Sequence, residues 1–362
     1  MAQPLTSQAR DAFGGTWIDE PDALDQLARR PYDDELRADL EQFIRTGVVI
    51  FRKAVAPEVI DRVVADTQRV HTDPARYVLK EKGKYIDPAT VRELGIGHRV
   101  VDLYAVSSAA RDAIYPERAA RFLREIFGEP ALAIQSISFQ YGSQQAIHQD
   151  TAYVISERPL SLAATWLALE DITPGTGELI YYPGGHRFDH YLFANGFKGW
   201  TPRRDGEEAH RAYLAQLHEQ AKARGIALQR FHANKGDILV WHADLPHGGS
   251  KLQREGTRRS LVTHFVPQSV KANYKHVVGD KYFELHHPSG HGFSARHYDL
   301  RRIDDEGRAA LLYDGGITMR GGKPIAGVNA GVVAHPDSIE GTDGRAPAAA
   351  GAKGLLNRML GR

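Results

Sequence analysis

The sequence predicts a mainly β fold with flanking helices, a sandwich or barrel of the jelly-roll kind. Between residues 131 and 267, short apolar runs with strand character alternate with Gly- and Pro-containing turns, such as that at 174–177. Before residue 131, and again in an insertion, apolar residues recur at helical spacing instead. Several short strands joined by such turns are typical of a jelly roll, with the helices packed around it.

These patterns divide the chain into regions. We expect an N-terminal helical and strand region over 1–130, a β core over 131–267 with a helical insertion at about 190–226, a C-terminal extension over 268–337 and a flexible tail over 338–362. The extension is irregular, aromatic and His-rich as far as residue 298 and Gly-rich near 311–327, which gives no clear strand signal. The tail has the composition of a linker.

Individual elements follow from apolar periodicity. The expected helices are 21–29, 33–45, 56–70, 116–127 and 207–224. The expected strands are 48–51, 131–141, 160–169, 179–182, 237–241 and 257–266. The polar stretch 71–100, with Lys80 and Lys84, is interpreted as a solvated face, and a loop that borders a site is the alternative.

Composition excludes several classes of function. The 362 residues include 46 Lys+Arg and 45 Asp+Glu, so a net charge of +1 gives no sign of a nucleic-acid or membrane partner. There is no Cys, which excludes disulfides, Cys-based zinc sites and thiol catalysis. The first residues lack a basic segment followed by an apolar run, and no stretch reaches about 18 apolar residues. We therefore expect a cytoplasmic protein without a membrane span; its oligomeric state does not follow from the sequence.

A candidate metal site begins with His148 and Asp150. Residues two apart in an extended backbone point to the same face, so an imidazole and a carboxylate converge there. His247 is the best third donor, because it follows an apolar strand and precedes two glycines that allow close backbone approach to a ligand. His242 flanks the same strand and is the rival. Two His and one carboxylate form the facial triad that suits non-haem Fe(II).

A candidate carboxylate-binding pair follows at the start of the strand 257–266. Arg258 and Ser260 share a face by the two-residue period, and a guanidinium beside a hydroxyl suits a carboxylate. Arg259 competes with Arg258, but only one of the two can point inward, and Ser260 favours Arg258. The turn that carries His148 and Asp150 is called the metal turn below. Trp166 lies on the strand after it, where a large aromatic side chain could line the pocket.

Candidate substrate contacts surround the metal turn. Gln145, Gln149 and Tyr153 either line the substrate pocket or bond the backbone, and His186 either shapes a turn or contacts substrate. The aromatic and basic insertion hints at a polar or anionic small-molecule ligand; its residues are Phe193, Phe197, Trp200, Arg203 and Arg204. Four C-terminal histidines lack a carboxylate pattern or regular spacing, so they are not interpreted as a second metal site; these are His286, His287, His291 and His297.

Three segments, 141–151, 177–187 and 247–260, resemble the phytanoyl-CoA dioxygenase family, and the resemblance extends over roughly residues 35–267. These are Fe(II)/2-oxoglutarate oxygenases with a double-stranded β-helix (cupin-like) fold. The resemblance implies His148, Asp150 and His247 as iron ligands, Arg258 as the partner of the 2-oxoglutarate distal carboxylate, and Trp166 beside this cosubstrate. Gly185 stands where the family turn Pro-Gly-Ser-His has Ser.

The resemblance implies that the protein uses O2 to hydroxylate a small or medium organic molecule, with release of succinate and CO2. The carboxylate of Asp150 argues against halogenation, because related halogenases lack it. A non-catalytic binding protein on the same fold and a zinc hydrolase that uses the same triad are the alternatives. Neither a CoA-binding patch nor an acyl groove is visible, so the family name does not identify the substrate.

Overall fold

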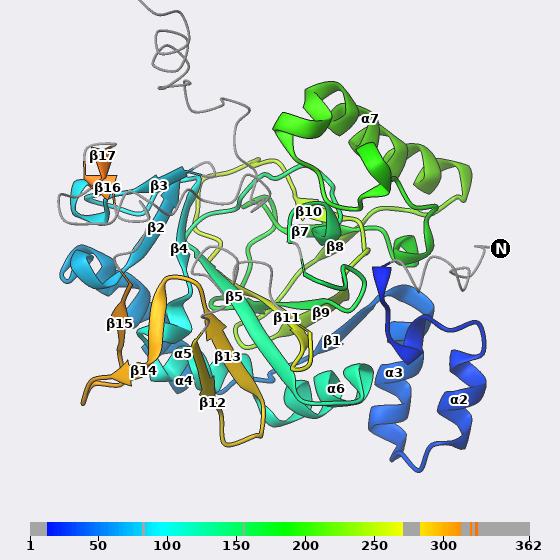
Figure 1. Cartoon of the computed structure of the whole chain (residues 1–362), viewed down its shortest axis with the longest axis horizontal. Helices are drawn as coiled ribbons and strands as arrows, with labels where there is room; N and C mark the ends of the chain where they lie inside the picture. The colour runs from blue at the N-terminus through cyan, green and yellow to red at the C-terminus, as the bar shows by residue number, and fades with distance from the viewer. Residues whose placement is uncertain are drawn as a thin grey trace, which may run out of the picture.

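The computed structural model describes residues 13–81, 84–154, 156–270, 283–312, 319–320 and 323–324. The expected flexible tail and most of the Gly-rich stretch lie outside these residues. Within them, the chain forms one large sheet, one small sheet, two short hairpins and a set of covering helices (Figure 1).

The large sheet has ten strands in the order β1-β9-β6-β11-β5-β4-β2-β3, with β13 joined to β5 and β12 joined to β13. The small sheet has the order β10-β7-β8. The strands are β1 (Val48–Phe51), β2 (Val78–Glu81), β3 (Lys84–Ile86), β4 (His98–Val101), β5 (Ala131–Phe139), β6 (Ala163–Ala168), β7 (Leu179–Tyr181), β8 (Gln229–Phe231), β9 (Ile238–His242), β10 (His247–Gly249), β11 (Ser260–Pro267), β12 (Phe283–His286), β13 (Gly292–Ala295), β14 (Tyr298–Ile303), β15 (Ala309–Leu311), β16 (Met319–Arg320) and β17 (Lys323–Pro324). Almost all pairings are antiparallel, and the predicted jelly-roll class is confirmed.

Five of the six α-helices in the described ranges agree with the periodicity of the sequence. They are α2 (Ala23–Arg29), α3 (Asp34–Thr46), α4 (Pro57–Gln68), α5 (Ser108–Ile114), α6 (Glu117–Phe127) and α7 (Pro202–Ala223). Helix α3 begins where the Asp33 side chain accepts from Leu36 N and ends at Gly47 in the left-handed region (φ 72°). Helix α5 was not predicted; its N-cap is Ser107, whose hydroxyl accepts from Ala110 N. None of the helices in the described ranges combines the length and apolarity that crossing a membrane requires.

The two faces of the large sheet have different roles. Leu261, Leu167 and Val240 belong to the main hydrophobic core, together with buried residues of α3, α4, α5 and α6. On the opposite face, strand register places Trp166 beside Val262, and Ala164 between His264 and Trp241. Side chains at alternate positions share a face, so this second face presents His264 and Trp241 to the interior between the sheets.

The interpretation of 71–100 as a solvated face is wrong. Strands β2, β3 and β4 lie in this stretch and extend the large sheet beyond β5. Lys80 is only 4% exposed, and its Nζ lies 4.4 Å from the centroid of the Tyr85 ring. The sequence did not indicate these strands because they contain charged residues. The strands with which they pair are remote in sequence or separated from them by polar turns.

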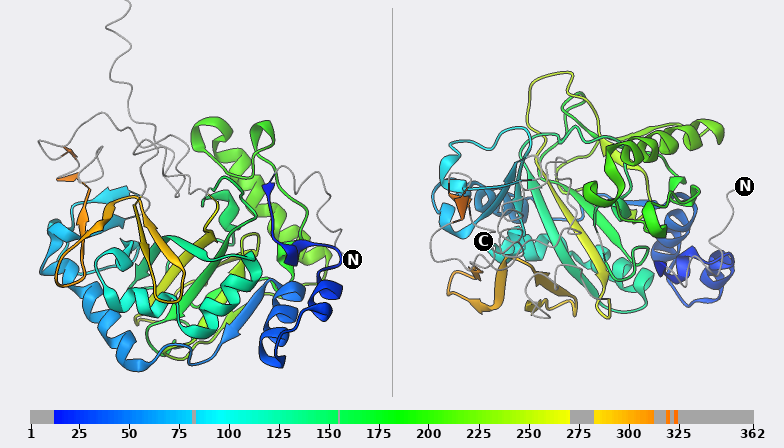
Figure 2. Two further views of the ribbon diagram at one scale, coloured as in Figure 1. Left: turned by 60° about the horizontal axis from the view of Figure 1, so that its bottom comes forward. Right: turned by 45° about the horizontal axis from the view of Figure 1, so that its top comes forward.

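The interpretation of residues up to 298 as irregular is also wrong for the part that the structure describes. The hairpin β12–β13 lies there, and β13 pairs in parallel with β5 through Gly292 opposite Leu132. A strand of four residues gives almost no periodic signal, and its partner is about 160 positions earlier in the chain. The orange strands of this extension lie on the opposite side of the molecule from α2 and α3 in both views of Figure 2.

Candidate metal and cosubstrate site

The backbones of His148 and His247 are hydrogen-bonded to each other. His148 N donates to His247 O at 2.8 Å, and His247 N donates to His148 O at 2.9 Å. Gly248 was expected to allow approach to a ligand; instead, a Cβ there would lie 2.7 Å from the carbonyl oxygen of Gln145. A glycine at this position therefore lets β10 pack against the metal turn, and this packing joins two segments that are about 100 residues apart.

The side chains of His148, Asp150 and His247 converge. One ligand atom from each lies within 4.8 Å of the others. Asp150 Oδ1 is 3.8 Å from His148 Nε2 and 3.5 Å from His247 Nε2. All three residues are buried, with 4–6% of their surfaces exposed. Within the described ranges, no other group of His, Asp or Glu residues has this spacing.

Both imidazoles are held in one tautomer. His148 Nδ1 lies 2.7 Å from Ala146 O, and His247 Nδ1 lies 2.9 Å from Leu245 O. A carbonyl oxygen can only accept, so Nδ1 carries the proton and Nε2 presents a lone pair. Burial and the neighbouring His247 lower the pKa of His148 to about 3, which keeps this imidazole neutral at pH 7.

The orientation of Asp150 depends on two residues that the sequence analysis missed. Trp241 Nε1 donates to Asp150 Oδ2 at 2.6 Å, and His264 Nε2 lies 3.5 Å from the same oxygen. Burial opposes ionisation, but the imidazoles of His247 and His264 outweigh it and hold the pKa of Asp150 well below its usual range. The two-residue period could have placed Trp241 and His264 on the site face, but only after the register of β6, β9 and β11 was known.

Arg258 is buried at 3% exposure and points toward the interior. Its Nη1 donates to Ser260 Oγ at 3.0 Å, and its Cζ lies 5.4 Å from the Trp166 ring centroid. Its Nε has no hydrogen-bond partner, and burial lowers the pKa of Arg258 to about 10. Arg259, by contrast, is half-buried and pairs with Glu170. Strand parity thus separates the two arginines as the sequence analysis expected, although Arg258 precedes β11 rather than lying inside it.

His242, the rival ligand, lies away from the triad. Its Nε2 is 2.8 Å from Asp19 Oδ1, and its ring packs against His186. His186 Nε2 in turn faces Ile44 O at 3.3 Å, and burial lowers the pKa of His186 to about 3. Both imidazoles connect the N-terminal helices to the β core.

Two of the other candidate substrate residues, Gln145 and Tyr153, lie next to His148. Gln145 Nε2 lies 3.2 Å from His148 Nε2, and the Tyr153 ring centroid lies 5.3 Å from that of His148. Tyr153 OH also pairs with His210 Nε2 at 2.5 Å. Gln149 points elsewhere, since its amide donates to Asp244 O at 2.7 Å.

The insertion packs directly on the metal turn. Trp200 N donates to Ala152 O at 3.0 Å, and Thr151 Oγ1 donates to Asp244 Oδ1 at 2.5 Å. Lys198 pairs with Asp244, and both residues are at least 96% buried. Arg204 is paired with Asp205 inside the insertion, so it does not offer the free charge that the composition suggested.

Three of the four C-terminal histidines, His287, His291 and His297, have structural partners. His291 Nδ1 accepts from Ala131 N at 2.8 Å and its ring stacks on Tyr115. His297 Nε2 lies 3.0 Å from Tyr85 OH, and His287 Nδ1 lies 2.8 Å from Ser289 Oγ.

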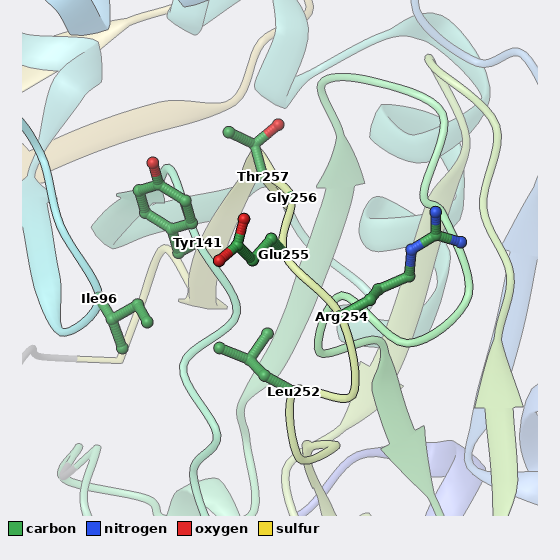
Figure 3. Close-up of a pocket in the computed structure, with 7 residues that line it drawn as sticks. All are labelled: Ile96, Tyr141, Leu252, Arg254, Glu255, Gly256 and Thr257. Carbon is green, nitrogen blue, oxygen red and sulfur yellow. The ribbon is translucent and has the colours of Figure 1, made fainter.

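A cavity of about 590 Å³ lies at the Arg258 end of the large sheet. It is lined by Ile96, Tyr141, Leu252, Arg254, Glu255, Gly256 and Thr257 (Figure 3). Ile96 precedes β4, Tyr141 follows β5, and Thr257 precedes Arg258, so the cavity opens where these strands begin or end. Its lining includes none of His148, Asp150, His247 and Arg258, so this cavity is separate from the metal cluster.

Among curated proteins, the chain is similar to "Phytanoyl-CoA dioxygenase, peroxisomal" of Homo sapiens, with 27% identity over 137 residues, which are 38% of this chain and 37% of that protein. The Bos taurus protein of the same name is 26% identical over 123 residues, which are 34% of each chain. These matches therefore span little more than a third of the length of either relative.

Among solved structures, the chain is similar to the "non-heme alpha ketoglutarate dependent carbocyclase SnoK from nogalamycin biosynthesis", with a TM-score of 0.50 and 14% identity over 67% of this chain and 87% of that one. It is also similar to "EctD from S. alaskensis in its apoform", with a TM-score of 0.48 and 19% identity over 68% of this chain and 81% of that one. The first of these likenesses shows the shared fold. Residues 43–260, more than half of the chain, match the family model "Phytanoyl-CoA dioxygenase (PhyH)". The chain belongs to the phytanoyl-CoA dioxygenase family.

Proposed function

We propose that this protein is an Fe(II)- and 2-oxoglutarate-dependent oxygenase that hydroxylates a small or medium organic molecule, with release of succinate and CO2. The observation that carries the proposal is the pairing of two features. One is the buried His148–Asp150–His247 cluster. The other is Arg258, a buried guanidinium that makes no ion pair with a carboxylate in the described ranges. Membership in the family supports the same reading.

The donor set fits ferrous iron. His148 Nε2, His247 Nε2 and Asp150 Oδ1 would hold the ion, and two nitrogens and one carboxylate leave positions for a cosubstrate and O2. When bound, iron and 2-oxoglutarate supply the oxidising power, which no side chain of the chain can provide. The retained Asp150 argues against halogenation, because its carboxylate takes the position that a halide would need.

The chain itself binds and orients the reactants. Arg258 and Ser260 would hold the distal carboxylate of 2-oxoglutarate, which satisfies a buried guanidinium whose Nε has no partner. Trp166 and Phe139 lie on either side of this guanidinium, at 5.4 and 5.7 Å from its Cζ. The insertion closes over the metal turn through Trp200. Exclusion of water from this interior strengthens each polar contact with the bound reactants.

A zinc hydrolase could use the same three donors, but it would leave Arg258 without a role. A non-catalytic binding protein would have no need for two imidazoles held with their Nε2 lone pairs toward one carboxylate. Both alternatives are therefore less well supported than the oxygenase.

The test begins without oxygen. Fe(II) and 2-oxoglutarate added to the purified protein under argon should produce a metal-to-ligand charge-transfer band in the visible range. The band should be absent in His148→Ala and present in His242→Ala, because His242 bonds Asp19 instead of the cluster. Admission of O2 with a substrate panel should then yield succinate. Failure of the unsubstituted, iron-loaded protein to give the band would exclude this function.

A further inference from the structure

Asp244 lies in the loop between β9 and β10, just before the candidate ligand His247, and it hydrogen-bonds to the metal turn. Thr151 Oγ1 donates to Asp244 Oδ1 at 2.5 Å, and Gln149 Nε2 donates to Asp244 O at 2.7 Å. Gln149 and Thr151 are the residues on either side of Asp150. Asp244 therefore connects the segment that carries Asp150 to the segment that carries His247.

The metal turn depends on contacts of this kind. Asp150 begins a single 3-10 turn, η6 (Asp150–Ala152). Hydrogen bonds in 3-10 turns have poorer geometry than those in α-helices, so three residues do not hold this shape by themselves. The insertion supplies further support, because Gln149 N donates to Tyr213 OH at 2.7 Å and Trp200 N donates to Ala152 O at 3.0 Å. The main chain around Asp150 is therefore held from outside the turn.

Lys198 of the insertion provides the counter-charge for Asp244. Its ammonium pairs with Asp244 Oδ2, and His190 Nδ1 lies 2.8 Å from Lys198 Nζ and 3.2 Å from Asp244 Oδ2. Burial opposes ionisation of Asp244, but the charge of Lys198, followed by the contact with His190, holds its pKa well below its usual range. Lys198 and Thr151 contact different oxygens of this carboxylate, so Lys198 fixes the position of the oxygen that accepts from Thr151.

A gain in stability does not account for this pair. Replacement of a buried ion pair by apolar residues of similar volume is often neutral or stabilising. The geometry gives a better reason, since one oxygen of Asp244 faces the insertion and the other faces the metal turn. The pair is placed to transmit the position of the insertion to the main chain beside Asp150.

We propose that Lys198 and Asp244 are positioning residues that act through the hydroxyl of Thr151. They hold the metal turn, and with it Asp150, at the distance from His247 that a bound metal ion requires. This inference rests on the proposed function, because it assumes that the three-donor cluster binds a metal ion. It gives the insertion a part in metal binding in addition to its cover over the site.

The experiment titrates Co(II) into the iron-free protein under argon. The visible d–d absorption of Co(II) reports both its affinity and its coordination geometry. Thr151→Val removes the hydroxyl but keeps the shape of the side chain, so it should lower Co(II) affinity by about tenfold and alter the d–d spectrum. Thr151→Ser keeps the donor and should bind Co(II) within about twofold of the unsubstituted protein. Lys198→Met is the second variant, with the same direction expected, in case Thr151→Val does not fold.

The matched control is Thr67→Val. Thr67 is a buried residue of α4, on the core side of the large sheet, and its Oγ1 donates to Val63 O at 2.9 Å. Loss of a buried hydroxyl should lower the melting temperature of both valine variants, but only Thr151→Val should lose Co(II) affinity. An equal loss of affinity in Thr67→Val, or no recovery in Thr151→Ser, would overturn the proposal. Unchanged affinity and spectra in Thr151→Val and Lys198→Met would overturn it as well.

The charge-transfer band distinguishes failure of this proposal from failure of the proposed function. If the unsubstituted protein binds Co(II) but gives no band with Fe(II) and 2-oxoglutarate, the oxygenase function fails, while the Co(II) titrations still judge the positioning role. If the band forms and the substitutions leave metal affinity unchanged, the positioning role alone is wrong. If the unsubstituted protein does not bind Co(II), both proposals are wrong.

Discussion

Trp241 donates its indole N–H to the carboxylate of Asp150 at 2.6 Å, on the oxygen that faces away from the two metal-site imidazoles. The hydrogen bond leaves Oδ1 toward His148 and His247, so an aromatic residue of β9 determines how the carboxylate is presented. Such supporting bonds commonly change metal affinity by about 10- to 100-fold.

Trp241→Phe should therefore lower Fe(II) affinity by about one order of magnitude while the ring continues to fill the core. Competition against a metal-binding dye under argon measures the change. Trp166→Phe is the control, since its Nε1 has no hydrogen-bond partner and it lies beside Arg258. Equal metal affinities in the two variants would show that the indole bond does not orient Asp150.

Arg258→Met should lower the affinity for 2-oxoglutarate by at least about 100-fold, because a buried charge-assisted pair is lost. The same change should raise the melting temperature of the ligand-free protein, since the depressed pKa of Arg258 shows that burial of its charge is costly. The charge-transfer titration and a thermal melt provide the two readings. Arg259→Met is the control, because Arg259 pairs with Glu170 and should leave cosubstrate affinity unchanged.

Lys198→Met should destabilise the protein by about 3 kcal/mol, because Asp244 is left buried with less counter-charge. Adding Asp244→Asn should recover part of this loss. Lys235→Met gives the comparison: Lys235 pairs with Asp61 at the surface, so its loss should cost less than about 1 kcal/mol. Urea unfolding at pH 7 measures the free energy of unfolding of the three variants. Similar losses for the two lysines would contradict the importance of the buried pair.

The stability of the protein should fall between pH 6.5 and 4 in part through His291. Burial, followed by the charge of Arg124, lowers the pKa of His291 to about 4, and its Nδ1 accepts from Ala131 N. Because unfolding restores the ordinary value of 6.5, the unfolded chain binds a proton that the folded chain does not. This stabilisation is complete above pH 6.5 and is lost as the pH decreases toward 4.

His291→Gln keeps an acceptor for Ala131 N but cannot take up that proton. Its free energy of unfolding should therefore approach that of the unsubstituted protein as the pH falls from 7 to 5, by about 2 kcal/mol. Urea titrations at a series of pH values measure this convergence. Parallel curves for the two proteins would exclude His291 as a source of the pH dependence.

The metal cluster could be predicted because its signals are local. His148 and Asp150 are two residues apart, and His247 stands between an apolar strand and two glycines. The choice of Arg258 over Arg259 also followed from the two-residue period of a strand. Each inference needed only a few adjacent residues.

The remainder of the site depends on contacts between distant segments. Trp241 and His264 reach Asp150 only because β9 and β11 flank β6 in the folded sheet. Lys80 looked solvated because its charge dominates a short polar stretch, but in the folded sheet it lies opposite Arg99 and Tyr85 and is buried. Strand order of this kind is set by the whole chain, so local periodicity could not supply it.

The reciprocal backbone bonds between His148 and His247 fix the separation of two donors independently of any ion. A centre of this kind is preorganised, so loading should follow the rate of ion entry rather than a folding step. It also means that other donor types could be introduced at these two positions to change metal preference, because the main chain, and not the imidazoles, maintains the frame.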